Sequence, residues 1–252
     1  MALIVDRAHA GTPETSWQRS GRLDALRPLV IERPPKVVVV APHPDDEVLG
    51  TGGLLRHLSL SGVDVEVLAV TDGEASHGAG PAGTSRRLAQ IRSQESRLAL
   101  RRLCIRPPQV SRLALPDGRV GDHIAELGRA LSDRAEEEVL WLAPWGSDGH
   151  PDHDACGRVA AEVARRCGVR LVSYLVWAWH WADPDGHDLP WDQCRRFDLD
   201  PSCSERKWWA IQAFASQIRP RSADPDDDPV LPPSVLAHFR RTQEVFVDRG
   251  AH

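Results

Sequence analysis

The chain has 252 residues, 41% of them hydrophobic and 27% charged, which is ordinary for a globular protein with one large core. A formal net charge of -5 and a pI near 6.1 argue against nucleic-acid and anionic-membrane partners. No apolar run approaches the roughly 20 residues that span a bilayer, no secretory signal is evident, and the five cysteines form no Cys-x-x-Cys pair, so we expect a cytoplasmic protein.

Residues 1–35 are predicted to form an N-terminal arm, partly helical over 12–29, and residues 36–252 to form a single domain. Short β-branched runs, typical of buried strands, then alternate with longer segments of helical period. The strand candidates are 37–41, 64–70, 110–115, 138–143 and 170–178, and the helix candidates between them are 46–60, 84–103, 120–136 and 153–167. This alternation predicts an α/β fold with a mainly parallel sheet.

The alternation ends after the last of these strands. Residues 179–203 are predicted to form an irregular insertion rich in tryptophan, and a loop this long inside a compact domain is often functional. A helix is predicted over 204–216, a surface loop rich in proline and aspartate over 219–233, and a short closing helix near 234–242.

Two clusters of metal-binding side chains follow strand candidates. The first comes after residues 37–41 and the second after residues 138–143; together they contain His43, Asp45, Asp46, His150, Asp152 and His153. Open α/β sheets place their sites at the C-terminal ends of strands, so we expect the two clusters to meet there. Imidazoles and carboxylates are ligands of catalytic zinc, which uses about three of them and keeps one position open.

The spacing suggests a role for each residue. His43, Asp46 and His153 are the predicted metal ligands, two imidazoles and one carboxylate. A divalent metal lowers the pKa of a bound water, and Asp45 is then free to act as the general base that lets this water attack an amide. His150 is predicted to stabilise the oxyanion or protonate the leaving amine.

Two further carboxylates, Asp148 and Asp152, are predicted to orient an imidazole by hydrogen bonding. The structural alternative is that the aspartates merely cap helices, as Asp commonly does. Several carboxylates and three histidines at two strand-to-helix transitions favour the metal site.

The motifs also resemble a known family. Three segments resemble the sequence signature of the PIG-L/LmbE family of zinc-dependent N-deacetylases. They are Pro42-His43-Pro44-Asp45-Asp46-Glu47, Gly50-Thr51-Gly52-Gly53 and His150-Pro151-Asp152-His153. Further agreement lies in Thr71-Asp72-Gly73-Glu74, in Arg92-Ser93-Gln94-Glu95, and in the segment from Lys207 to Ser216-Gln217. The resemblance covers roughly residues 36–217.

The resemblance implies a Rossmann-like fold with three αβα layers, and hydrolysis of an N-acetyl group on an N-acetylglucosamine-type small molecule. It implies the same ligands, base and electrophilic histidine as the spacing does. Some family members have a tyrosine where this chain has Asp148, and the only tyrosine here is Tyr174. Oxyanion stabilisation is then left to the metal and His150, and the transfer of a mycothiol-pathway substrate is weakened.

Three residues are predicted substrate contacts: Arg92, Trp179 and His180. For Arg92 the alternative is a surface ion pair with Glu95. For the tryptophans near the insertion the alternative is packing, with Trp177 in the core.

Two other functions stay open at this stage. One is an amidase that cleaves a larger acyl or thiol-conjugate amide, and the other is a noncatalytic sugar-binding metalloprotein. The ligand set also admits iron or another divalent ion in place of zinc. The sequence does not predict an oligomeric state.

Overall fold

The computed structural model describes residues 11–78, 84–105, 109–220 and 228–250. Its strands are β1 (Arg27–Pro28), β2 (Lys36–Ala41), β3 (Asp64–Thr71), β4 (Gln109–Leu115), β5 (Leu140–Pro144), β6 (Arg170–Tyr174), β7 (Cys194–Asp198) and β8 (Gln243–Asp248). They form one sheet in the order β1-β7-β8-β6-β5-β2-β3-β4. Strand β8 is antiparallel to both neighbours and the other pairs are parallel, which confirms the mainly parallel sheet.

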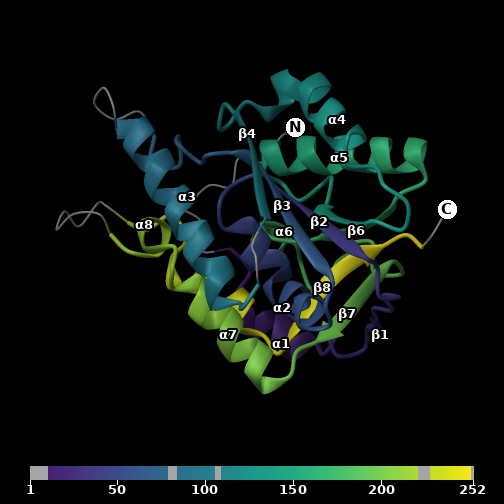
Figure 1. Cartoon of the computed structure of the whole chain (residues 1–252). Coiled ribbons are helices and arrows are strands. Elements are labelled where there is room, and N and C mark those ends of the chain that lie inside the picture. The colour runs from purple at the N-terminus through teal and green to yellow at the C-terminus, as the bar shows by residue number, and fades with distance from the viewer. Residues whose placement is uncertain (1–10, 79–83, 106–108, 221–227, 251–252) are drawn as a thin grey trace.

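Helices cover both faces of this sheet, so the three-layer architecture is also confirmed (Figure 1). Helices α2 (Asp46–Leu60), α3 (Thr84–Arg102) and α7 (Pro201–Ile211) pack together on one face, and α4 (Ile124–Ser132) and α5 (Pro151–Cys167) pack on the other. The shorter helices are α1 (Glu14–Ser20), η1 (Val120–His123), α6 (Ala178–Trp181), α8 (Ala215–Ile218), α9 (Pro233–Leu236) and η2 (Ala237–Arg240).

Strand β2 shows why the sequence folds in this way. Its side chains alternate between the two cores: Val37 and Val39 join the cluster that includes α2 and α3, whereas Val38 and Val40 join the cluster that includes α4 and α5. All four are fully buried. A strand covered on both faces needs a continuous apolar run, and this run supplies it.

The order of the strands creates the crevice in which the site lies. From β2 the chain moves outward through β3 to β4, then returns to β5 beside β2 and continues in the opposite direction to β6. The loops after β2 and β5 therefore diverge from neighbouring strands, which is the switch point where open α/β sheets bind ligands.

The second half of the chain differs from the sequence-based expectation. The predicted insertion 179–203 contains most of α6 and the strand β7, and β6 ends at Tyr174 instead of continuing to residue 178. The helix predicted over 204–216 is two helices, α7 and α8, and β8 follows the closing helical segment. Part of the predicted loop 219–233, residues 221–227, lies outside the described residues.

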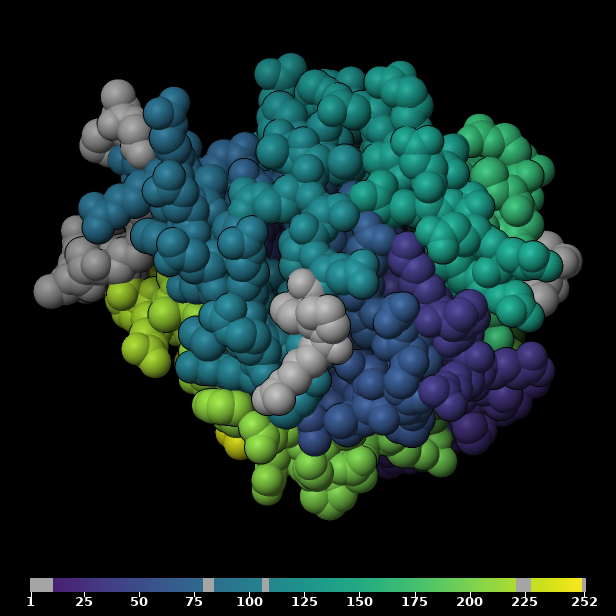
Figure 2. Space-filling model, in the orientation of Figure 1, coloured from purple at the N-terminus to yellow at the C-terminus, as the bar shows by residue number. Residues whose placement is uncertain are grey.

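The described part of the predicted arm packs onto the same sheet as the rest of the chain. Trp17 on α1 is fully buried with its ring centroid 5.0 Å from that of Trp179, and β1 pairs with β7. The segment before β2 (purple) lies against the body of the protein in Figure 2. Among the described residues, no helix combines the length and the apolar character needed to cross a membrane.

Candidate metal centre

Three potential ligand atoms meet at the switch point. His43 Nδ1 lies 3.2 Å from Asp46 Oδ2, and His153 Nε2 lies 3.1 Å from the same oxygen and 3.3 Å from His43 Nδ1. A tetrahedral site with bonds of about 2.0–2.1 Å has ligand–ligand edges of about 3.3 Å. The three atoms therefore match one face of a tetrahedral divalent-metal site.

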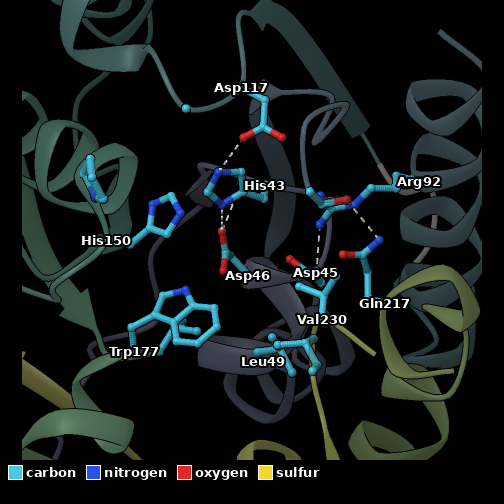
Figure 3. Close-up of a pocket in the computed structure, with 15 residues that line it drawn as sticks. His43, Asp45, Asp46, Leu49, Arg92, Asp117, His150, Trp177, Gln217 and Val230 are labelled. Carbon is cyan, nitrogen blue, oxygen red and sulfur yellow. Dashed lines mark hydrogen bonds and ion pairs between the residues drawn. The ribbon is translucent and has the colours of Figure 1, made fainter. Parts of the chain in front are cut away.

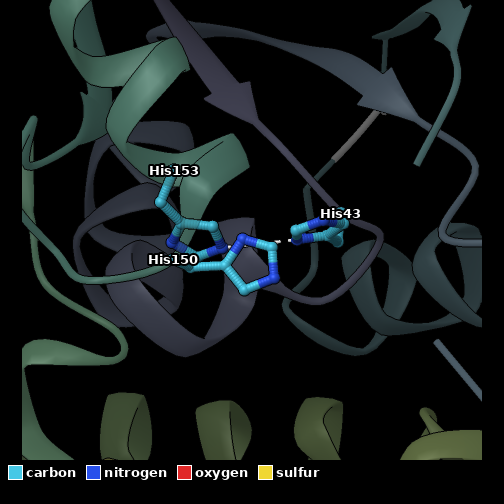
Figure 4. Close-up of side chains that lie close together, drawn as sticks. All are labelled: His43, His150 and His153. Atoms are coloured by element: carbon cyan, nitrogen blue, oxygen red, sulfur yellow. Dashed lines mark hydrogen bonds between the residues drawn. The ribbon is translucent and has the colours of Figure 1, made fainter. Parts of the chain in front are cut away.

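Three elements bring these ligands together. His43 follows the C-terminal end of β2, Asp46 opens α2, and His153 lies in the first turn of α5 beyond β5. Figure 4 shows His43 and His153 approaching each other with His150 beside them. The His43 backbone N–H also donates to Asp46 Oδ2 over 2.9 Å, which fixes the turn between β2 and α2.

Carboxylates hold the outer nitrogen of both imidazoles. Asp148 Oδ2 lies 2.9 Å from His153 Nδ1, while Asp152 Oδ2 and Asp117 Oδ1 each lie 3.2 Å from His43 Nε2. Such partners fix the tautomer of a histidine and leave its other nitrogen for a metal. Both aspartates predicted to orient an imidazole thus contact one.

The electrostatic field of the cluster favours a cation. Burial lowers the pKa of His153, but the carboxylates of Asp46 and Asp148 outweigh it and raise this pKa to about 9. Burial likewise opposes charge on His43, yet Asp117, Asp152 and Asp46 raise its pKa well above the usual value. Excess negative charge of this kind is what a bound divalent metal would balance.

Asp45 lies beside the ligands and keeps its carboxylate in the pocket. Burial raises its pKa, Arg92 opposes this, and the nearby Asp46 adds to it, so that the pKa is about 7. Its backbone has φ 151°, an uncommon conformation for a residue other than glycine. The Asp45 backbone N–H donates to Glu47 Oε2 over 3.0 Å, which helps to hold this conformation.

His150 occupies the N-cap position of α5. Its Nδ1 accepts the backbone N–H of Asp152 over 3.2 Å, so the neutral ring carries its proton on Nε2. Burial and the neighbouring His43 and His153 lower the His150 pKa to about 3. At neutral pH the ring is therefore an uncharged hydrogen-bond donor.

A pocket of about 330 Å³ opens onto this cluster (Figure 3). Its lining divides into polar and apolar groups. Besides the cluster itself, the polar lining is Ser76, Arg92, Asp117 and Gln217, and the apolar lining includes Leu49, Val176, Trp177, Val230 and Leu231. A small pocket with a few polar groups is typical of small-molecule sites.

Comparison with known proteins identifies the family. Residues 38–164 match the PIG-L family model, described as GlcNAc-PI de-N-acetylase. The chain belongs to the PIG-L family. This match contains both histidine clusters of the site.

Several proteins that are similar to this chain are deacetylases by name. The chain is 31% identical over 166 residues to the 1D-myo-inositol 2-acetamido-2-deoxy-alpha-D-glucopyranoside deacetylase of Corynebacterium efficiens (57% of this chain, 53% of the relative). It is 30% identical over 139 residues to the diacetylchitobiose deacetylase of Thermococcus kodakarensis (53% of this chain, 51% of the relative). The chain thus spans about half the length of the curated relatives it matches.

The fold is shared with solved structures as well. A crystal structure of the zinc-inhibited form of teicoplanin deacetylase Orf2 aligns with a TM-score of 0.59 and 19% identity, over 73% of this chain and 85% of that one. At this identity the likeness supports the Rossmann-like fold alone.

The predicted substrate contacts are only partly brought to the pocket. Arg92 lines it, and its Nη2 lies 3.0 Å from Asp45 Oδ2, so it is not a surface residue. Trp179 and His180 are not among the residues that line this pocket, so the structure does not bring them to the metal cluster, and their contact with substrate stays a prediction. Because β6 ends early and α6 begins at Ala178, Trp179 turns inward against Trp17, and Trp177 reaches the pocket instead.

Three residues near the centre were not among the predicted site residues. Asp117 contacts His43, Gln217 lines the pocket, and Glu47 binds the backbone of Asp45. Asp117 follows the strand β4, so the C-terminal edge of the sheet was the available signal. Glu47 and Gln217 each stand in a motif that the family resemblance had already singled out.

Proposed function

We propose that this protein is a zinc-dependent N-deacetylase that removes the acetyl group from an N-acetylglucosamine-type small molecule. The observation that carries the proposal is the triangle of His43, Asp46 and His153 ligand atoms, with the Asp45 carboxylate beside it at a pKa of about 7. The names of the curated relatives, which are amino-sugar deacetylases, support this reaction class.

The same three residues would hold the metal. Two imidazoles and one carboxylate in a tetrahedral arrangement suit zinc, and the fourth position would stay open. When bound there, zinc would lower the pKa of a water and polarise the acetyl carbonyl.

Asp45 is the proposed general base. Its pKa of about 7 leaves a large fraction ionised near neutral pH, while keeping the carboxylate basic enough to accept a proton from the attacking water. Arg92 holds one carboxylate oxygen, Oδ2, over 3.0 Å, so Oδ1 is the oxygen available for that proton.

His150 is the proposed electrophilic partner. Because its Nδ1 accepts a backbone N–H, its Nε2–H is the group that can donate to the developing oxyanion of the acetyl carbonyl. The neutral ring donates without adding a charge next to the metal ligands. This arrangement provides a donor in a chain that has Asp148 where some relatives have tyrosine.

Trp177 supplies a face for the sugar. Its indole lies 6.4 Å from the His150 ring with an interplanar angle of 23°, and it forms part of the pocket lining. An indole beside a reactive centre can pack against the apolar face of a sugar ring.

The test is acetate release from a panel of N-acetylglucosaminyl compounds by the zinc-loaded enzyme, with Asp45→Ala alongside. We expect the wild-type protein to release acetate and Asp45→Ala to bind zinc stoichiometrically without turnover. Asp122→Ala, which changes an exposed aspartate paired with Arg119, is the matched control. Zinc bound without acetate release from any compound would reject the proposal.

A further inference from the structure

Gln217 is buried in the pocket wall, and one of its side-chain polar atoms has no hydrogen-bond partner among the described residues. Its side chain is fully buried, and its Oε1 accepts no hydrogen bond from any residue that the structure describes. Gln217 lines the same pocket as the metal cluster, and it lies beside Arg92, at the end opposite His150 and Trp177 (Figure 3). A buried acceptor without a partner is unfavourable, so such an atom in a ligand pocket needs an explanation.

A chain of hydrogen bonds determines the orientation of the Gln217 side-chain amide, and so which of its two ends has no partner. Ser216 Oγ donates to Glu95 Oε2 over 2.7 Å, so the single hydroxyl proton of Ser216 is already used. Ser216 Oγ can therefore only accept from Gln217, whose amide atom 2.8 Å away must be the Nε2 donor. This chain of hydrogen bonds assigns the amide orientation and leaves the carbonyl oxygen as the free end.

The backbone around Gln217 is also fixed. The Ser216 backbone N–H donates to Glu95 Oε1 over 2.8 Å, and the Gln217 backbone carbonyl accepts the Leu231 N–H over 2.9 Å. Glu95 belongs to α3, the helix that also carries Arg92 one turn earlier. One helix thus positions both Asp45, through Arg92, and the Gln217 amide, through Ser216.

We propose that Oε1, the side-chain carbonyl oxygen of Gln217, accepts a hydrogen bond from a hydroxyl group of the bound amino sugar and thereby selects substrates that carry that hydroxyl. This inference rests on the proposed function. The occupant has to be a donor because the amide N–H groups are committed to Ser216 and, over 3.5 Å, to Ser76. A sugar hydroxyl is the donor that an amino-sugar substrate offers away from its scissile amide.

The test is a double-mutant cycle between the enzyme and the substrate. Wild type and Gln217→Leu are compared on an N-acetylglucosaminide and on its 3-, 4- and 6-deoxy analogues. We expect Gln217→Leu to lower kcat/KM for the parent compound roughly ten- to a hundredfold. For one deoxy analogue the two enzymes should be equal, because the interaction is then already missing.

Two further variants separate recognition from folding. Ser216→Ala keeps the Gln217 side chain but removes its anchor, and we expect a smaller loss directed at the same hydroxyl. Gln94→Leu makes the matched change at an exposed position of α3 and should behave as wild type. Equal losses on all four substrates, or no loss for Gln217→Leu, would overturn the assignment.

Equilibrium binding distinguishes this inference from the proposed function. The same sugars are titrated calorimetrically into zinc-loaded Asp45→Ala, with and without Gln217→Leu. Weaker binding of the parent compound in the double variant supports the role of Gln217 even if the wild type releases no acetate. Equal binding in the two variants, or no binding at all, counts against it whatever the wild-type activity.

Discussion

Arg92 and Asp45 form a buried ion pair in which Nη2 lies 3.0 Å from Oδ2. The same guanidinium donates to the carbonyls of Pro44 and Gly73, each over 3.0 Å, so it fixes both the carboxylate and the loop that presents it. The ion pair opposes the effect of burial, which by itself would raise the Asp45 pKa further. Arg92 is therefore a positioning residue for the proposed base.

Replacing Arg92 with glutamine should shift the pH profile upward. Without the guanidinium, burial and Asp46 raise the Asp45 pKa with less opposition, since only His43 still lowers it, and less of the carboxylate is ionised at pH 7. We expect the acidic limb of kcat/KM to move to higher pH and activity at pH 7 to fall roughly tenfold or more. Arg97→Gln, at an exposed position of α3, is the control. An unchanged acidic limb would show that Arg92 does not tune Asp45.

Replacing Asp117 with asparagine should weaken metal binding. Asp117 shares His43 Nε2 with Asp152, and loss of such a carboxylate partner commonly reduces metal affinity roughly ten- to a hundredfold. The measurement is zinc affinity by competition with a chelator. Asp122→Asn should retain wild-type affinity, and equal affinity in both variants would leave Asp152 as the effective partner of His43.

The Asp148 carboxylate has a structural role, holding the backbone after β6, that its position in the sequence does not predict. The fully buried carboxylate accepts the backbone N–H groups of Val176, Trp177 and Ala178 as well as contacting His153. Asp148→Asn would set an amide N–H₂ against these donors and leave buried groups unpaired. We expect metal-free Asp148→Asn to lose about 2–4 kcal/mol of unfolding free energy.

Chemical denaturation of metal-free protein checks this prediction, with Asp122→Asn as the exposed control. If Asp148→Asn unfolded at the wild-type denaturant concentration, the three backbone contacts would be of little energetic importance.

The site could be anticipated where local pattern and topology agree. Val37 to Val40 identify a doubly covered strand by themselves, and parallel strands bring their C-terminal ends to one edge. From this alone the His43 and His153 clusters were expected to meet, and their ligand atoms lie 3.3 Å apart. Zinc binding and the catalytic roles of these residues stay predictions.

The remaining features depend on contacts between distant segments. Strand β7 contains Arg195 and Arg196, a weak strand signal, and forms because β1 and β8 pair with it. Asp117 follows a proline and precedes a glycine, which indicates a turn, and it reaches His43 only because β4 lies on the same side of the switch point. No local pattern encodes such neighbours.

The junction between the N-terminal segment and the end of the chain should make stability depend on pH. Glu14 on α1 contacts His238 Nδ1 over 2.7 Å and Arg241 Nη2 over 2.6 Å. Burial raises the Glu14 pKa, but these two partners outweigh it, and the net pKa is lowered. Burial also lowers the His238 pKa, and Glu14 does not fully compensate.

Both shifts act in the same direction. A carboxyl whose folded pKa is depressed contributes stability above its usual pKa of 4.5, and this contribution disappears as the pH falls through the lower folded value. A histidine with a depressed pKa opposes protonation, so stability also declines as the pH falls below 6.5. Glu14→Gln should remove the first contribution.

We therefore expect the difference in unfolding free energy between wild type and Glu14→Gln to be greatest above pH 4.5 and to shrink as the pH falls further. Denaturation of both metal-free proteins across pH 3–8 measures it, and the comparison cancels the shared groups that Glu14 does not contact; His238, which loses a partner, does not cancel. Glu205→Gln on the exposed face of α7 is the control. A difference independent of pH would mean that Glu14 acts through packing rather than through its charge.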